Sequence, residues 1–181
     1  TTGEAAPTDE AVPADETAPV EPSLNQPLTE NGEEVGHTYT ATITPTSVQV
    51  GETQDFTVTI TETGDKALGR ATVDVPFHTA YADGASLTVA TSGDIWTATW
   101  DADNHQIDLE ANSKPADLLS TNEWVSVTFT ATAPRNTGTY TFNTAAYYYH
   151  GSPLHSHADT LSPPAPGGYP KVTVNAADWF S

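Results

Sequence analysis

The sequence contains no cysteine and no methionine, and only five lysine and arginine residues stand against 24 aspartate and glutamate residues. Without cysteine, the chain cannot build a disulfide framework, a thiolate metal site or a cysteine nucleophile. The formal net charge of −19 would repel the phosphates of a nucleic acid, so we expect no nucleic-acid partner. No apolar run reaches the roughly 20 residues that cross a bilayer, and we expect no membrane insertion.

The chain begins at Thr1 without any methionine, which indicates a processed product or an excised fragment. Its composition is rich in threonine and poor in lysine, and it has no Asn-x-Ser/Thr acceptor for N-glycosylation. We therefore expect an exported prokaryotic protein, extracellular or on the cell surface, from which a signal peptide has been removed.

Residues 1–36 differ sharply from the rest of the chain. They contain nine carboxylates, five prolines, no lysine or arginine and no aromatic residue. Such a segment cannot bury enough apolar surface to offset about 1 to 2 kcal/mol per residue of lost backbone freedom. We expect a disordered or extended acidic tail or linker. It would serve as a solvated spacer, or alternatively become ordered on a neighbouring subunit as an added strand.

From His37 onward, apolar residues recur at every second position, as in strands with one buried face. Turn signals such as Thr63-Gly64-Asp65 and Asn136-Thr137-Gly138 separate the runs. One stretch, Tyr140 to Tyr148, reads as a single strand. The predicted core consists of Phe56, Val58, Ile60, Val73, Val75, Trp96, Trp100, Ile107, Leu109, Val125, Val127, Phe129, Tyr140, Phe142, Val172 and Val174.

Eight or nine short strands and almost no helix signal predict an all-β fold for residues 37–181. The only plausible helical turn lies in a connection, at residues 115–119. We predict two antiparallel sheets packed as a sandwich, with a long connection rich in His, Tyr and Pro at residues 147–169.

Several segments together resemble the immunoglobulin-like modules of bacterial and archaeal surface and exported proteins. They are TPTSVQVGETQDFTVTITETG (44–64), ATVDVP (71–76), IWTATWDADNHQIDLEA (95–111), WVSVTFTATAPRNTGTYTFNTAA (124–146) and PKVTV (170–174). The resemblance implies a stalk, an adhesin spacer, a pilus-like subunit or an accessory domain of an enzyme. Two features depart from the family pattern: Asn122 stands where a turn glycine is usual, and the connection at 147–169 is unusually long.

Three histidines, His150, His155 and His157, lie close together in this connection. Neutral imidazoles bind copper and zinc, so the loop is a candidate site for a divalent metal. Alternatively, the histidines satisfy hydrogen bonds in a polar loop or face a partner.

Aromatic residues flank the same connection. Tyr147, Tyr148 and Tyr149 must point to both faces of an alternating strand, and Trp179 and Phe180 make the chain end apolar. These five residues are candidates for a protein interface. The tyrosines would also suit stacking on a glycan, or would only pack at a sheet edge.

Oxygen ligands crowd one predicted hairpin and make it a candidate for calcium. They are Asp101, Asp103, Asn104, Asp108 and Glu110. The spacing lacks the glycine and the final glutamate of an EF-hand loop, and a polar hairpin tip is the simpler alternative.

No catalytic motif occurs: there is no Gly-x-Ser-x-Gly elbow, phosphate-binding loop, dinucleotide fingerprint or Ser-x-x-Lys. We expect a non-enzymatic structural or adhesion module, acting through protein partners or copies of itself in a surface appendage, filament or S-layer-like assembly. The alternatives are an exported copper- or zinc-binding protein and a carbohydrate-binding accessory module. Because like charges repel, salt should favour self-association.

Overall fold

The computed structural model describes residues 38–65, 67–77, 87–147 and 168–178, together with the backbone of Tyr148 and of two short strands near the N-terminus. The chain divides into two compact units, Thr1–Glu34 and Val35–Ser181. In the first unit, β1 (Thr29–Glu30) and β2 (Glu33–Glu34) pair antiparallel. The rest of the predicted tail lies outside the described residues.

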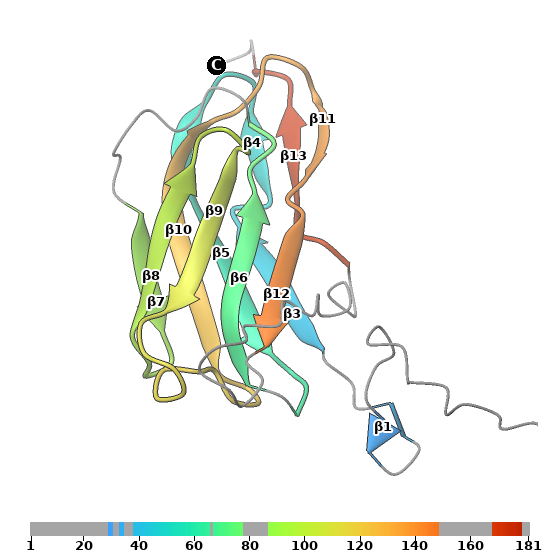
Figure 1. Cartoon of the computed structure of the whole chain (residues 1–181). Coiled ribbons are helices and arrows are strands. Elements are labelled where there is room, and N and C mark those ends of the chain that lie inside the picture. Colours follow the sequence, from blue (N-terminus) through green and yellow to red (C-terminus); the bar gives the residue numbers. More distant parts are fainter. Residues whose placement is uncertain are drawn as a thin grey trace, which may run out of the picture. The chain divides into compact units, whose positions relative to one another are not determined.

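In the second unit, two four-stranded antiparallel sheets lie face to face (Figure 1). One sheet has the order β3-β5-β10-β7 and contains β3 (Tyr39–Thr44), β5 (Thr53–Glu62), β10 (Trp124–Thr132) and β7 (Thr88–Thr91). The other has the order β12-β6-β9-β8 and contains β12 (Thr144–Tyr148), β6 (Leu68–Asp74), β9 (Gln106–Ala111) and β8 (Trp96–Asp101). The all-β two-layer prediction is therefore confirmed.

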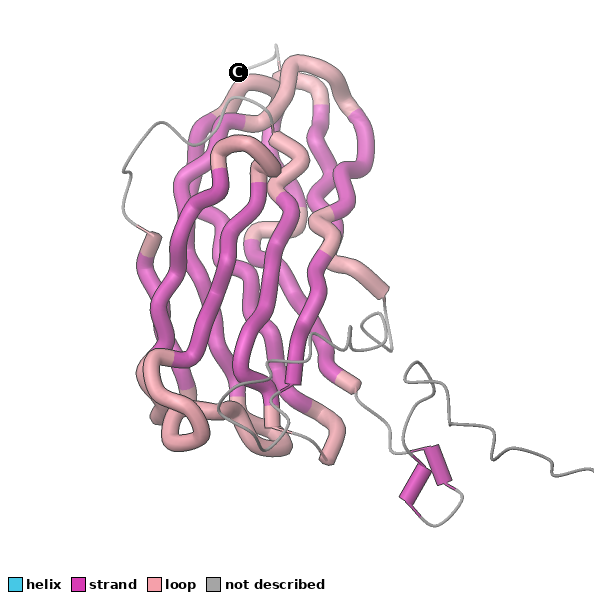
Figure 2. Tube along the Cα trace, in the orientation of Figure 1, coloured by secondary structure: helices cyan, strands magenta, loops and turns pink. Residues whose placement is uncertain are grey.

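The described residues contain strands and loops but no helix (Figure 2). Across this same part of the chain, no helix is long and apolar enough to cross a membrane. The connection at residues 115–119, expected as a helical turn, forms hydrogen-bonded turns in which the Asp117 amide donates to the Ser113 carbonyl at 2.8 Å.

A small third sheet departs from the prediction of purely antiparallel pairing. Its order is β11-β13-β4, formed by β11 (Gly138–Thr141), β13 (Lys171–Asn175) and β4 (Ser47–Gln49). The last strand, β13, pairs parallel with β4, near the start of the sandwich. Alternation within each strand predicts which residues are buried, but it carries no information on strand direction.

The predicted single strand from Tyr140 to Tyr148 is wrong, because the chain changes sheets in its middle. The Phe142 amide donates to the Pro170 carbonyl at 2.9 Å, which continues the pairing of β11 with β13. One residue later, the Asn143 carbonyl accepts from the Asp74 amide at 2.8 Å, and β12 then pairs with β6. The apolar pattern runs through this change without interruption, so the sequence does not reveal it.

The core lies between the two large sheets and matches most of the prediction. All the residues predicted for the core are buried except Trp100 and Tyr140, which pack against it only partly buried. Five large apolar side chains of the described core were not in the predicted set: Tyr39, Ile43, Leu68, Phe77 and Leu119. The Phe56 ring lies at the centre of an aromatic cluster, with ring centroids 5.4 Å from Phe77, 6.1 Å from Phe129 and 6.3 Å from Phe142.

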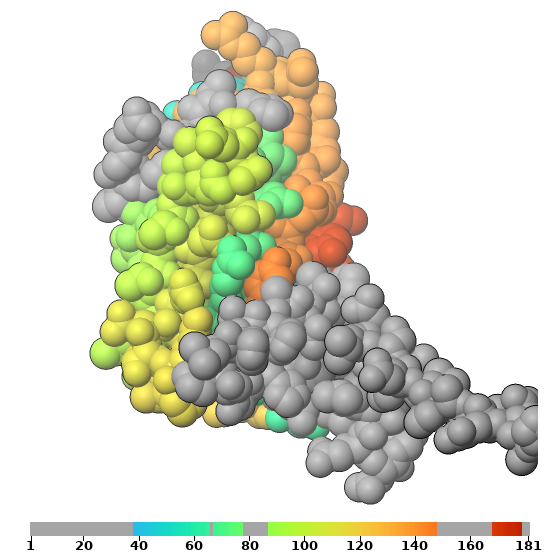
Figure 3. Space-filling model, in the orientation of Figure 1, coloured from blue at the N-terminus to red at the C-terminus, as the bar shows by residue number. Residues whose placement is uncertain are grey.

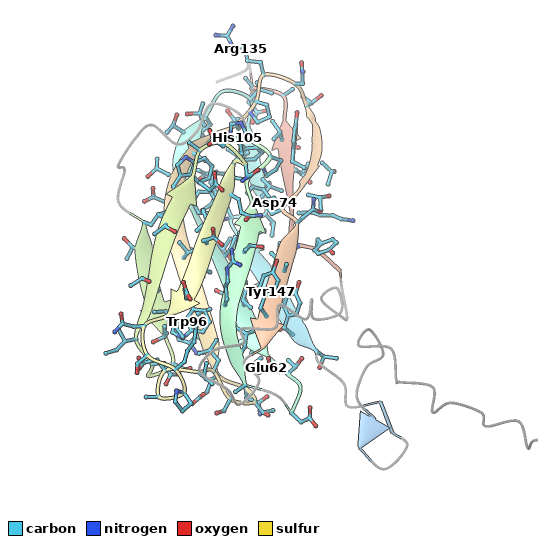
Figure 4. All side chains as sticks on the ribbon, viewed as in Figure 1. Glu62, Asp74, Trp96, His105, Arg135 and Tyr147 are labelled. Carbon is cyan, nitrogen blue, oxygen red and sulfur yellow. The ribbon has the colours of Figure 1, made fainter. Side chains whose placement is uncertain are left out.

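Glu62, the last residue of β5, is a buried carboxylate with a relative exposure of 1%. It continues the inward alternation of Phe56, Val58 and Ile60 (Figure 4). Its Oε1 accepts the Gly64 amide at 2.6 Å, while its buried Oε2 has no hydrogen-bond partner. Burial raises the pKa of Glu62 to about 7, because the charged form loses its hydration.

We predict that Glu62→Gln removes a pH-dependent loss of stability. The folded chain holds the proton more tightly than the unfolded chain, so the free energy of unfolding should fall as pH rises from about 4.5 to about 7. The variant should match the wild type at pH 4 and be more stable by about 3 kcal/mol at pH 8. Urea unfolding at both pH values measures this difference, with the exposed Glu52→Gln as the control. Equal stability of wild type and Glu62→Gln at pH 8 would contradict it.

Asn122 stands where the resemblance leads us to expect a turn glycine, and its backbone conformation accounts for this difference. Its φ angle is 71°, in the left-handed region, and its amide donates to the Glu62 carbonyl at 2.7 Å. Glycine adopts this conformation without strain, and asparagine tolerates it better than most residues. The turn therefore has the left-handed backbone conformation that a glycine at this position would adopt without strain.

Substitutions at this turn should separate backbone strain from side-chain loss. Asn122→Gly should leave the free energy of unfolding unchanged within about 0.5 kcal/mol, whereas Asn122→Ala should lower it by about 1 kcal/mol. Urea unfolding of the two variants checks the prediction. An alanine variant as stable as the glycine variant would show that the φ angle imposes no such cost.

Candidate functional site

The outer face of the sheet β12-β6-β9-β8 combines charged and aromatic side chains. Strand register places eleven side chains outward in rows across it, between the buried residues of the same strands; we call this set the Arg70 face. It consists of Ala145 and Tyr147 on β12, Arg70, Thr72 and Asp74 on β6, Gln106, Asp108 and Glu110 on β9, and Thr97, Thr99 and Asp101 on β8. These strands form the front of the sandwich in Figure 3.

Arg70 organises the middle of this face. Its Nη2 donates to Asp108 Oδ1 on the neighbouring strand at 2.5 Å. Its guanidinium carbon lies 5.2 Å from the centroid of the Tyr147 ring on the strand at its other side. The hydrogen bond that Arg70 donates to Asp108 is the main cause that raises the pKa of Arg70 above its ordinary value. One cation thus links three strands across the face.

Further polar contacts hold Asp74, Gln106 and Glu110 of the face in place. Gln106 Nε2 donates to Asp74 Oδ1 at 2.7 Å, across the β6–β9 pair. Lys114 Nζ, in the loop after β9, donates to Glu110 Oε1 at 2.6 Å. The polar groups of the face are therefore ordered before any ligand arrives, which lowers the entropic cost of binding.

Tyr147 is the one residue of the predicted interface set whose side chain the structure describes, and its role in an interface stays a prediction. It lies half-buried on the Arg70 face, where strand register makes it the neighbour of Arg70. Figure 4 labels Tyr147 on β12. Tyr148 closes β12 with its side chain outside the described part, and Tyr149, Trp179 and Phe180 lie outside it altogether. Since the guanidinium of Arg70 lies over the Tyr147 ring, stacking of a sugar on that side of the ring would have to displace it. Glycan binding remains a prediction.

The metal predictions are likewise untested. His150, His155 and His157 lie outside the described residues. Within the described ranges, no three histidine, aspartate or glutamate side chains come together as a metal site would require. Binding of copper, zinc or calcium stays a prediction.

The carboxylates proposed for calcium have other partners in the described hairpin. Asp101 accepts the amides of Asp103 and Asn104 and the Asn104 side-chain amide, the last at 2.7 Å. These bonds, led by the one from the Asn104 side chain, lower the pKa of Asp101. Asp108 and Glu110 point outward on β9, each bonded to a cation. Asp101 thus closes the turn, while Asp108 and Glu110 bond cations of the sheet and of the loop after β9.

Another group of acidic residues, Asp94, Asp117 and Glu123, lies near the turn between β7 and β8. The pKa of Asp94 is raised, mainly by burial and then by the charges of Glu123 and Asp117. Both of these neighbours bond backbone amides: Asp117 Oδ1 accepts the Ile95 amide at 3.2 Å, and Glu123 Oε2 accepts the Ser120 amide at 2.5 Å. Their contacts indicate a role in holding loops.

Arg70 itself was not among the predicted site residues. A sequence signal was present, because Arg70 is one of only five cationic residues and lies in a strand where alternation would place it outward. The partner strands were not readable from the sequence, since the pairing of β6 with both β9 and β12 joins residues far apart in the chain.

We predict that the Arg70–Asp108 pair contributes modestly to stability. A double-mutant cycle with Arg70→Ala and Asp108→Ala should give a coupling energy of about 0.5 to 1 kcal/mol, because both side chains are partly exposed and water screens the pair. Urea unfolding at low and high salt measures the coupling and its screening. A coupling above about 3 kcal/mol would be typical of a buried pair and would contradict this description.

No protein-family model and no curated protein matches the chain. Solved structures do match. One is an uncharacterised protein from Nocardia farcinica with an immunoglobulin-like fold, which is 16% identical in sequence. The match covers 77% of this chain and 98% of that protein's chain, with a TM-score of 0.47. A type I cohesin from Pseudobacteroides cellulosolvens is 11% identical (80% and 96% covered, TM-score 0.42). The C-terminal domain of an antigen I/II-family protein from Streptococcus pyogenes is 13% identical (81% and 43% covered, TM-score 0.40).

These similarities are low and concern the fold alone; a protein that catalyses macrocyclization is also among the matched structures. The absence of catalysis therefore stays a prediction for this chain. The facing four-stranded sheets and their buried layer make the second unit an immunoglobulin-like β-sandwich.

Proposed function

We propose that this chain is a non-catalytic module of a surface or exported assembly, and that it binds a partner protein through the Arg70 face. The observation that carries the proposal is the position of Arg70, bonded to Asp108 and held over Tyr147 on the outer side of the sheet. Arginine and tyrosine are enriched among the residues that contribute most to protein interfaces.

The charges of the Arg70 face indicate the chemistry of the partner. Four carboxylates, Asp74, Asp101, Asp108 and Glu110, outnumber the single cation among its outward positions. The whole chain, this face included, has a net charge of −19. A partner with a basic surface would be attracted over a distance, and its association rate would fall with rising salt.

The same contacts favour binding over catalysis. Asp108 and Glu110 lie on one face of β9, where a carboxylate pair would be considered for glycoside hydrolysis. Each is instead bonded to a cation of the same sheet or its loop, Asp108 to Arg70 and Glu110 to Lys114. The two carboxylates therefore stabilise the face and are not left free to act on a substrate.

Site-specific photo-crosslinking in the native cells tests the proposal. A photoreactive amino acid at Ala145, beside Tyr147 on β12, should crosslink to one protein, and Arg70→Ala should weaken the product because it removes the side chain that bonds Asp108 and lies over Tyr147. The same photoreactive residue at Thr173, exposed on β13 of the third sheet, is the matched control. Failure of the Ala145 position to crosslink, or an identical product from Thr173, would contradict binding through the Arg70 face.

A further inference from the structure

The outer face of the other large sheet is built almost entirely of threonine. Strand register places fifteen side chains outward on β3, β5, β10 and β7, and eleven of them are threonines; we call this set the threonine face. The threonines are Thr40, Thr42, Thr44, Thr53, Thr57, Thr59, Thr61, Thr88, Thr128, Thr130 and Thr132, and the other four residues are Asp55, Ala90, Trp124 and Ser126.

This face carries very little charge. Asp55 is the one charged residue among its fifteen positions, and it accepts a hydrogen bond from Thr130 Oγ1 at 2.6 Å. Five of the eleven positions on the Arg70 face are charged. In a chain with a net charge of −19, a second copy can therefore approach the threonine face with less repulsion than the Arg70 face.

Several threonine hydroxyls on this face have partners within the sheet. Thr57 and Thr128 are hydrogen-bonded through their Oγ1 atoms at 2.8 Å, and Thr53 and Thr132 at 2.7 Å. A hydroxyl that already has such a partner loses less on leaving water than a hydroxyl that would be left unpaired. The threonine methyl groups and the half-buried Trp124 then supply apolar surface to an interface.

We propose that the threonine face is a self-association surface, on which a second copy of this chain packs sheet against sheet. At a strand spacing of about 4.8 Å and about 3.4 Å per residue, its four strands give a footprint of roughly 500 Å². Two copies would then bury about 1,000 Å², the lower limit for a specific interface. The dimer is therefore weak, and it forms at high local concentration such as that of a surface assembly.

Salt distinguishes this contact from partner binding at the Arg70 face. Rising salt screens the repulsion between two copies that each carry −19 charges, so it strengthens the threonine-face dimer. The same screening weakens the attraction of a basic partner to the Arg70 face. The inference does not depend on that partner, because it concerns the opposite outer surface of the sandwich.

Sedimentation of the full chain over a range of protein and salt concentrations tests the proposal. The wild type should shift from monomer to dimer with concentration, and more so at high salt. Thr42→Glu with Thr88→Glu, both exposed on edge strands of the threonine face, should remain monomeric. Thr97→Glu with Thr99→Glu adds the same two charges to exposed threonines of the Arg70 face and should dimerise like the wild type. Circular dichroism confirms that each variant is folded.

A charge-reversal pair distinguishes loss of the dimer through charge repulsion from loss through misfolding of the variant. Thr42→Lys with Thr88→Lys, mixed in equal amounts with the glutamate variant, should regain the dimer. A wild type that stays monomeric at every concentration and salt would overturn the proposal and leave the face to a neutral partner such as a polysaccharide. Equal effects of the two glutamate variants, or a mixture that remains monomeric, would overturn it as well.

Discussion

Burial of alternate side chains between two sheets is the constraint on which the rest of the structure depends. Without disulfides, the sandwich is held by apolar packing, centred on Phe56 and the rings around it. Because successive side chains of a strand point to opposite faces, filling the core also determines which residues lie outside. The outer faces are therefore free to differ in chemistry.

The two outer faces differ in their charge. On one sheet, Arg70, Tyr147 and several carboxylates form a charged and ordered surface suited to a basic partner. On the other, threonines pair through their hydroxyls and leave almost no charge. A module with one face for a partner and one for its own copies can be held in an assembly from both sides.

Glu62 is the exception to an otherwise apolar inner layer. It occupies the inward position that follows Phe56, Val58 and Ile60, and its carboxylate is buried with one oxygen unpaired. This arrangement costs stability when the group ionises, since burial raises its pKa to about 7. The neighbouring turn at Asn122 bonds to the Glu62 carbonyl, so the unusual carboxylate and the left-handed turn lie at the same end of the sandwich.

The all-β class, the inward residues of most strands and the hairpin from Trp96 to Ala111 followed from the sequence alone, because alternation and turn residues are local signals. Alternation also placed Arg70 and the threonines outward. Only the tertiary structure decided which strands are neighbours: the parallel pairing of β13 with β4, the change of sheet after Phe142, and the meeting of Arg70, Asp108 and Tyr147. These contacts join strands far apart in the chain, and strand order is set by how whole sheets pack, which no local pattern encodes.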